Sequence, residues 1–187
     1  MPALKDLRTK MFKIFIIFVL SLSGLSAIGA KQIIALEYAT GTVSQTYGAS
    51  AVSDDQTLSQ YGFKLGAKEN DYRLFLSYRY QAIESDTGYH LGIEFDNVYE
   101  FGPVGFYIGV IAGYSWYDFT GQDATVASVS LPYYGGNSGM TLTLGSIELD
   151  VGARYAYYLD GTAETVSAQV YTVNNMLTYY VGLNYLY

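Results

Sequence analysis

The feature that most constrains the fold of this sequence is an alternation of large apolar and smaller or polar residues that recurs along most of the chain. In residues 72–80, Tyr and Leu occupy every second position, and Arg73, Ser77 and Arg79 lie between them. The same alternation recurs in residues 34–41, 60–68, 89–96, 104–117, 147–157 and 177–187. A period of two places neighbouring side chains on opposite faces of a β-strand. The chain is therefore predicted to be all-β.

Glycine indicates which face of these strands points inward. Nine glycines fall on the polar face, namely Gly41, Gly62, Gly66, Gly92, Gly105, Gly109, Gly113, Gly152 and Gly182. A narrow barrel has little room inside for side chains, whereas glycines on the outer face of a soluble barrel would weaken its strands. We therefore predict a closed antiparallel up-and-down transmembrane β-barrel with a polar lumen and an apolar wall facing lipid. A soluble barrel with its apolar face inside is the alternative.

The strand count depends on one weak segment. An even number needs a strand at residues 163–173, where Val166, Ala168 and Val170 share a phase. Eight strands are then predicted, with six as the fallback. We expect short connections at 69–71, 97–103 and 159–162, an intermediate one at 82–87, a further short one near 174–175, and long ones at 44–57 and 118–143. Short turns at one end and longer loops at the other are typical of outer-membrane barrels.

Residues 1–30 are predicted to be a cleaved signal peptide that precedes the barrel domain of residues 31–187. Four basic residues, Lys5, Arg8, Lys10 and Lys13, precede an apolar run from Ile14, and small residues follow it. This order is typical of secretory signals. A membrane-anchoring helix is the alternative, but the apolar run is shorter than a span requires.

The last strand resembles a known group of proteins. It places Leu183, Tyr185 and Tyr187 on one face and ends on an aromatic residue. In this respect residues 31–187 resemble the small outer-membrane barrels that include the opacity-type surface proteins and the OmpA transmembrane domain. The resemblance implies a location in the cell outer membrane, contact with its lipid, and recognition of the final strand by the barrel-assembly machinery. We expect a monomer.

Tyrosine and tryptophan near strand ends indicate an aromatic girdle. Amphipathic rings are best placed at the two membrane interfaces. The predicted girdle consists of Tyr72, Tyr80, Tyr89, Tyr114, Trp116, Tyr155, Tyr157 and Tyr185.

The polar face carries equal numbers of opposite charges. Its predicted charge network comprises Glu37, Lys64, Lys68, Arg73, Arg79, Glu94, Asp96, Glu148, Asp150 and Arg154. Unpaired charge in a narrow lumen would be costly, so these groups are predicted to neutralise one another and plug the barrel. The alternative is a charged constriction in a small-solute channel.

The sequence predicts no catalytic, cofactor or metal site. His90 is the only histidine, and Arg79 is predicted to lie opposite it, as Asp96 is opposite Arg73. A lipid-A-modifying acyl chemistry would need a nucleophile and an orienting group beside His90; Ser77 lies on the adjacent strand, but its spacing is not distinctive. Cysteine is absent, and Asp54-Asp55 is read as solvated rather than as a calcium site.

The predicted extracellular connections are acidic. They contain Asp54, Asp55, Glu84, Asp86, Asp118 and Asp123 and no Lys or Arg. The net charge of −7 also argues against nucleic acid as a partner. In the loop 118–143, β-prone segments flank residues 132–137, which are turn-forming in composition, so we hypothesise a projecting β-ribbon, with a disordered loop as the alternative.

These features predict a structural or surface-interaction role through the loops. A host or surface ligand would bind through residues 44–57 and 118–143. A porin-like channel is the first alternative, and a lipid-modifying enzyme centred on His90 is the second.

Overall fold

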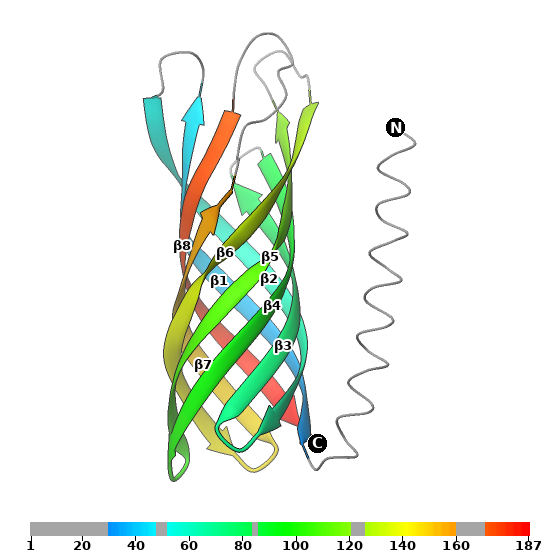
Figure 1. The fold of residues 1–187 in the computed structure, drawn as a ribbon, viewed down its shortest axis with the longest axis vertical. Helices are drawn as coiled ribbons and strands as arrows, with labels where there is room; N and C mark the ends of the chain where they lie inside the picture. Colours follow the sequence, from blue (N-terminus) through cyan, green and yellow to red (C-terminus); the bar gives the residue numbers. More distant parts are fainter. Residues whose placement is uncertain (1–29, 48–51, 84–85, 121–125, 160–170) are drawn as a thin grey trace, which may run out of the picture.

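The chain forms one closed antiparallel barrel of eight strands (Figure 1). The computed structural model describes residues 30–47, 52–83, 86–120, 126–159 and 171–187. The strands are β1 (Lys31–Tyr47), β2 (Val52–Glu69), β3 (Tyr72–Ile83), β4 (Asp86–Phe101), β5 (Val104–Thr120), β6 (Val126–Leu144), β7 (Ile147–Tyr158) and β8 (Tyr171–Leu186). Each strand pairs with its neighbour in sequence, and β8 pairs with β1 to close the sheet. The predicted all-β up-and-down barrel of eight strands is confirmed. The described residues include no helix that is long and apolar enough to cross a membrane.

Three tight turns lie at one end of the barrel, which we call the short-turn end (Figure 1). They follow Glu69, Phe101 and Leu144. Each contains one residue with a left-handed backbone: Asn70 (φ 48°), Gly102 (φ 64°) and Gly145 (φ 66°). Glycine and asparagine adopt this conformation most easily, so these residues fix where the chain reverses. The barrel closes at the same end, where Gln32 and Tyr187 exchange two backbone hydrogen bonds of 2.9 and 3.0 Å.

The sixth strand was not predicted. Residues 118–143 were expected to be a long connection, either a projecting β-ribbon that turns at 132–137 or a disordered loop. Both expectations were wrong for residues 126–143, because β6 runs through this turn-like stretch as a strand of the barrel and pairs with β5 and β7. One of its glycines faces a bulky group: a Cβ at Gly139 would lie 2.4 Å from the Tyr107 hydroxyl. Residues that favour turns in isolation are therefore needed here to make room inside a narrow barrel.

Other expected boundaries were also wrong: residues 44–47 and 52–57 of the predicted connection 44–57 belong to β1 and β2. The predicted connection near 174–175 lies within β8. The predicted short connection at 159–162 begins directly after β7, and its residues 160–162 lie outside the described part of the chain. The expected strand at 163–173 falls outside the described residues except for its last three, which belong to β8. The predicted total of eight strands was therefore correct, but it was reached by counting a strand at 163–173 in place of β6.

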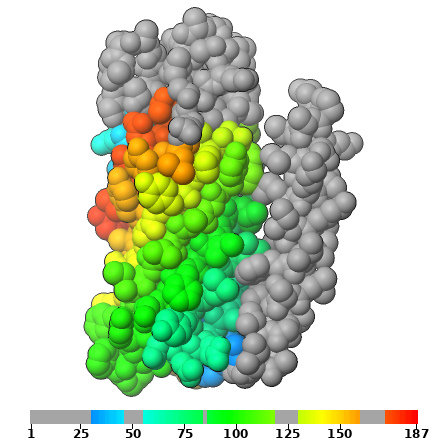
Figure 2. Space-filling view, in the orientation of Figure 1, coloured from blue at the N-terminus to red at the C-terminus, as the bar shows by residue number. Residues whose placement is uncertain are grey.

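The two faces of the sheet differ sharply in chemistry. Large apolar side chains are exposed on the outer face, where Ile108 and Val110 are each 63% exposed. Figure 2 shows the outer face of the green strands β4 and β5 as a continuous surface. The inner face instead carries buried charged and polar groups. Glycines make room for them: a Cβ at Gly92 would lie 2.1 Å from the Tyr133 hydroxyl.

Candidate functional site

The lumen is the candidate site because nearly all described charged groups with buried side chains converge there. Near the short-turn end, Arg73 lies at the centre of what we call the short-turn cluster. Its Nη1 donates to Glu148 Oε1 at 2.8 Å and to Asp150 Oδ1 at 3.1 Å, and its Nη2 donates to Asp96 Oδ2 at 2.9 Å. Lys68 Nζ also donates to Glu148, at 2.8 Å. These contacts join β2, β3 and β4 to β7 across the lumen.

A second group of ion pairs, the central cluster, lies further along the lumen around Glu37. Both oxygens of Glu37 accept from Arg154, at 2.9 and 2.8 Å. Arg79 Nε donates to Glu37 Oε1 at 2.9 Å, and Lys64 Nζ lies 3.1 Å from Glu37 Oε2. Glu94 accepts from Arg79 and lies 3.8 Å from Lys64. The cluster therefore draws side chains from β1, β2, β3, β4 and β7 into one network.

Two tyrosines connect these clusters. The hydroxyls of Tyr107 and Tyr180 are 2.5 Å apart. Arg73 lies 4.5 Å from the centre of the Tyr107 ring, and Arg154 lies 4.5 Å from the centre of the Tyr180 ring. Such cation–π contacts add attraction where the cations are desolvated. The linked aromatic pair thus spans the lumen from β5 to β8 between the two clusters.

The charges balance across the ten residues but not within each cluster. Lys64, Arg79 and Arg154 meet only Glu37 and Glu94 in the central cluster. In the short-turn cluster, Lys68 and Arg73 instead meet the buried carboxylates of Asp96, Glu148 and Asp150. Lys68 also pairs at 2.6 Å with Glu100, whose exposed side chain is not counted among the buried charges. The central cluster therefore has one surplus positive charge, and the short-turn cluster has one surplus negative charge. Attraction between these opposite surpluses favours stacking of the two clusters.

A third layer, the cap layer, lies toward the end of the long connections. His90 Nδ1 is 2.7 Å from Ser115 Oγ, and His90 Nε2 is 2.8 Å from Gln81 Oε1. Tyr117 donates a hydrogen bond of 2.7 Å to Tyr158. Buried apolar side chains surround these groups: Val43, Leu58, Ile83, Ile111, Leu131, Tyr133, Ala156, Val173 and Met176.

The arrangement Ser115–His90–Gln81 places a hydroxyl, an imidazole and an orienting amide in line. A nucleophile, a base and an orienting group form such a line in acyl-transfer sites. Here all three residues are at most 2% exposed, so a lipid substrate cannot reach them. Glutamine also lacks the charge with which a carboxylate stabilises an imidazolium ion. We interpret the arrangement as lumenal packing.

The serine that contacts His90 is Ser115, not Ser77, which was considered from the sequence because it lies on the adjacent strand. Ser77 donates to the Gly92 carbonyl at 3.2 Å and accepts from Arg79 Nη1 at 3.0 Å. Ser115 is the residue opposite His90, because the hairpin that reverses at Gly102 sets this register. The turn at Gly102 was thus the signal that could have identified Ser115. The predicted register of Arg79 with His90 and of Arg73 with Asp96 is present.

No group of three or more His, Cys, Asp or Glu side chains within the described residues could hold a metal ion. At the end of the long connections, Asp55 is exposed, Asp118 is half-buried and Asp86 is buried. The side chains of Asp54, Glu84 and Asp123 lie outside the described part of the chain.

The aromatic residues predicted as a girdle all lie on the outer face. Tyr80, Tyr89 and Trp116 are successive partners in the register from β3 to β5, and this row continues to Tyr61 and Tyr38 on β2 and β1. The other predicted positions, Tyr72, Tyr114, Tyr155, Tyr157 and Tyr185, are 40–53% exposed. On the last strand, Leu183 is also exposed, and Tyr185 stacks on Tyr187 at 6.0 Å. Tyr134 was not included in the predicted girdle, because this residue falls in the stretch expected to be a turn.

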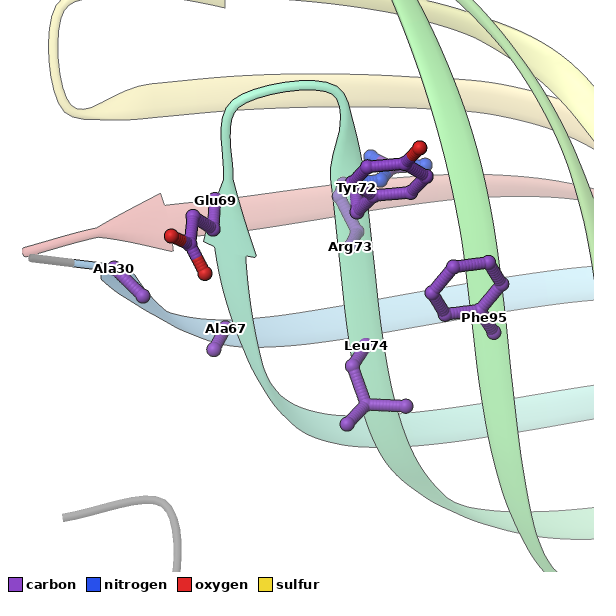
Figure 3. Close-up of a pocket in the computed structure, with 7 residues that line it drawn as sticks. All are labelled: Ala30, Ala67, Glu69, Tyr72, Arg73, Leu74 and Phe95. Atoms are coloured by element: carbon purple, nitrogen blue, oxygen red, sulfur yellow. The ribbon is translucent and has the colours of Figure 1, made fainter. Parts of the chain in front are cut away.

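A shallow hollow of about 170 Å³ lies in the barrel wall beside the turn between β2 and β3 (Figure 3). It is lined by Ala30, Ala67, Glu69, Tyr72, Arg73, Leu74 and Phe95. Tyr72, Leu74 and Phe95 belong to the apolar outer face, so we interpret the hollow as part of the wall rather than as a mouth of the lumen.

No family model and no curated protein sequence matches the chain. Several solved structures are similar to it. Neisserial surface protein A matches with a TM-score of 0.58 and 15% identity over 80% of this chain and 96% of that one. The attachment invasion locus protein Ail of Yersinia pestis, solved with the heparin analogue sucrose octasulfate, matches with a TM-score of 0.55 and 14% identity over 84% of this chain and 99% of that one. At these identities the similarity establishes a shared barrel fold.

Proposed function

We propose that the chain is an outer-membrane β-barrel that acts through its exposed end rather than through its lumen. The wall supports the membrane location. Exposed Leu, Ile, Val, Phe and Tyr side chains cover the outer face, and a closed sheet leaves no unpaired strand edge within the apolar region. In this proposal residues 1–30 direct export, the barrel-assembly machinery reads the strand ending in Leu183, Tyr185 and Tyr187, and the mature chain is a monomer in outer-membrane lipid.

The observation that carries the proposal is the set of side-chain contacts across the lumen. Ion pairs join β1 to β7 through Glu37 and Arg154, and β3 to β7 through Arg73 and Glu148. The hydroxyl pair of Tyr107 and Tyr180 joins β5 to β8. Removing one partner of a buried pair costs about 3–5 kcal/mol, so a column of water would have to displace strongly held groups. We infer that the lumen is plugged.

The surface role then falls to the connections opposite the short-turn end. The sequence contains no Lys or Arg from residue 80 to residue 153, or after Arg154. Of the Lys and Arg side chains in the described residues, Lys31 is the exposed one and the rest line the lumen. Ail was solved with the heparin analogue sucrose octasulfate. A polyanion of that kind would find no Lys or Arg in the connections at this end of the chain, so we propose a partner that tolerates an acidic surface or is attracted to it.

Ion conductance across planar bilayers tests the plug. Purified protein inserted from detergent is expected to leave the current at the level of the bare bilayer, with a larger outer-membrane porin as the positive control. Insertion is verified separately by flotation of the protein with lipid vesicles. Stable single-channel steps from the inserted wild-type protein would overturn the plug and favour the channel.

A further inference from the structure

At the end of the barrel that carries the long connections, β5 and β6 extend beyond the end of β7. β5 and β6 pair as far as Thr120 and Val126, whereas the pairing of β6 with β7 stops at Tyr133 and Tyr158. In Figure 1 β5 and β6 rise above the arrowhead of β7. Within the described residues, the segment Val126–Leu131 is therefore paired on its β5 side alone.

The direction of the backbone groups on β6 follows from two hydrogen bonds. Pro132 O accepts from the backbone N–H of Leu159, just after β7, at 2.9 Å. Thr143 N–H donates to Pro103 O, just before β5, at 2.7 Å. In an extended strand the N–H and C=O of one residue point to the same side, and successive residues alternate. Val126, Ser128 and Ser130 therefore direct their N–H and C=O groups away from β5, toward the open side.

An open strand edge is a template for another extended chain. Pro132 is compatible with an open edge. Proline has no backbone N–H, and an N–H at this position would point away from β5, to the side where the pairing with β7 has stopped. The ladder to β5 holds the edge in place, so a partner would add to it without reordering the barrel.

Charge indicates which extended chain the edge would accept. The four connections at this end and the strand ends beside them contain eight acidic residues and no Lys or Arg. Glu84, Asp123, Asp160 and Glu164 lie in the connections, and Asp54, Asp55, Asp86 and Asp118 lie at the adjoining ends of β2, β4 and β5. A field of one sign attracts partners of the opposite sign and repels those of the same sign.

We propose that the β6 edge at Val126, Ser128 and Ser130 binds an extended cationic peptide segment of a partner protein by strand addition. The proposal rests on the proposed function, because it needs this end of the barrel to lie outside the membrane.

Binding of a short synthetic peptide of alternating Lys and Val to the detergent-refolded full chain tests the proposal. The Ser128→Pro and Ser130→Pro variants each remove one N–H on the open side and leave the bonds to β5 intact. We expect each to weaken binding roughly fivefold or more. The matched controls Ser128→Ala and Ser130→Ala keep the backbone donor and are expected to bind like the wild type.

Amide hydrogen exchange in the wild-type protein provides a second measurement that does not depend on the folding of any variant. The Ser128 and Ser130 amides are expected to exchange fast alone and to slow down when the peptide is added. The Ala127 and Val129 amides bond to β5 and are expected to be slow in both states.

Three results would overturn the proposal. Equal binding of a peptide of alternating Lys and Pro, which carries the same charge but lacks the backbone donors, would show that electrostatics alone is responsible. No binding of the Lys–Val peptide would remove the site altogether. Slow exchange at Ser128 and Ser130 before any peptide is added would show that the edge is already covered, by the chain itself or by a second copy. None of these results bears on conductance across the bilayer. A failure of the peptide-binding proposal can therefore be distinguished from a failure of the proposed plug.

Discussion

At the scale of single residues, Glu37 is a carboxylate that holds three lumenal cations at hydrogen-bonding distance. It meets Arg154, Arg79 and Lys64, all within 3.1 Å. Each partner is at most 2% exposed, so water cannot replace the carboxylate. Such a cluster is stable only when every charge has a partner, because a buried cation without one retains the full cost of its desolvation.

Glu37→Gln is expected to lower the free energy of unfolding by about 3–5 kcal/mol. The substitution keeps the shape of the side chain and leaves the central cluster with three cations and one carboxylate. Urea unfolding of protein inserted in lipid vesicles measures the loss. Glu69→Gln is the matched control, because Glu69 is exposed at the short-turn end and is expected to change stability by less than about 0.5 kcal/mol. A similar small effect at Glu37 would contradict the view that the cluster is dry and paired.

Gly92→Ala is expected to cost about 1–3 kcal/mol, because the added Cβ would lie 2.1 Å from the Tyr133 hydroxyl. Tyr133→Phe removes that oxygen and is expected to recover much of the loss in the double variant. The same substitution at Gly136, where the Cβ would meet only the Gly109 carbonyl at 3.3 Å, serves as control. Urea unfolding of the wild type, the two single variants, the double variant and the Gly136→Ala control gives the comparison. No rescue by Tyr133→Phe would show that space for the hydroxyl is not what Gly92 provides.

At the scale of strands, β6 separates what the sequence can predict from what it cannot. The segments from 72–80 and 89–96 were identified because their outward side chains are all large and apolar, a pattern imposed by the wall. β6 instead combines Pro132, two adjacent glycines and Asn137. Read locally these residues predict a turn. Their role depends on Tyr107 and Tyr133, which reach into the space that the glycines of β4 to β7 leave free.

The same limit applies to the lumenal contacts. Alternation assigned the ten charged residues to the inner face, and hairpin registers placed Arg73 opposite Asp96. The contacts of Glu37 with Arg154 and of Arg73 with Glu148 join strands far apart in the sheet. Such contacts depend on the closure and stagger of the barrel, which a linear pattern does not contain.

Single cysteines in β6 test its assignment as a strand. Tyr134→Cys and Ser138→Cys lie on the outer face, and Asn137→Cys points into the lumen, where Asn137 is 5% exposed. In vesicles we expect the two outer positions to react with a lipid-soluble maleimide and Asn137→Cys to react with neither this nor a water-soluble reagent. Reaction of all three with the water-soluble maleimide would restore the turn predicted at 132–137.

At the scale of the whole molecule, positive and negative side chains are distributed differently. Cations are concentrated in the lumen, where carboxylates pair with them, and Lys31 is the exposed cation among the described residues. Acidic residues predominate in the connections. The apolar wall, the paired interior and the acidic ends are thus three regions with different partners: lipid, the protein itself, and the solvent or a ligand.

The central claim is that the outer wall faces lipid, and Trp116 reports on it directly. It is the one tryptophan in the chain and packs against Tyr114 on the outer face of β5, with their rings 5.3 Å apart. Its fluorescence in vesicles that contain lipids brominated at different depths measures its position. We predict strong quenching by bromines near the headgroup region, weaker quenching by bromines at the bilayer centre, and little quenching by acrylamide in the water. Strong quenching by acrylamide with none from any brominated lipid would contradict the account.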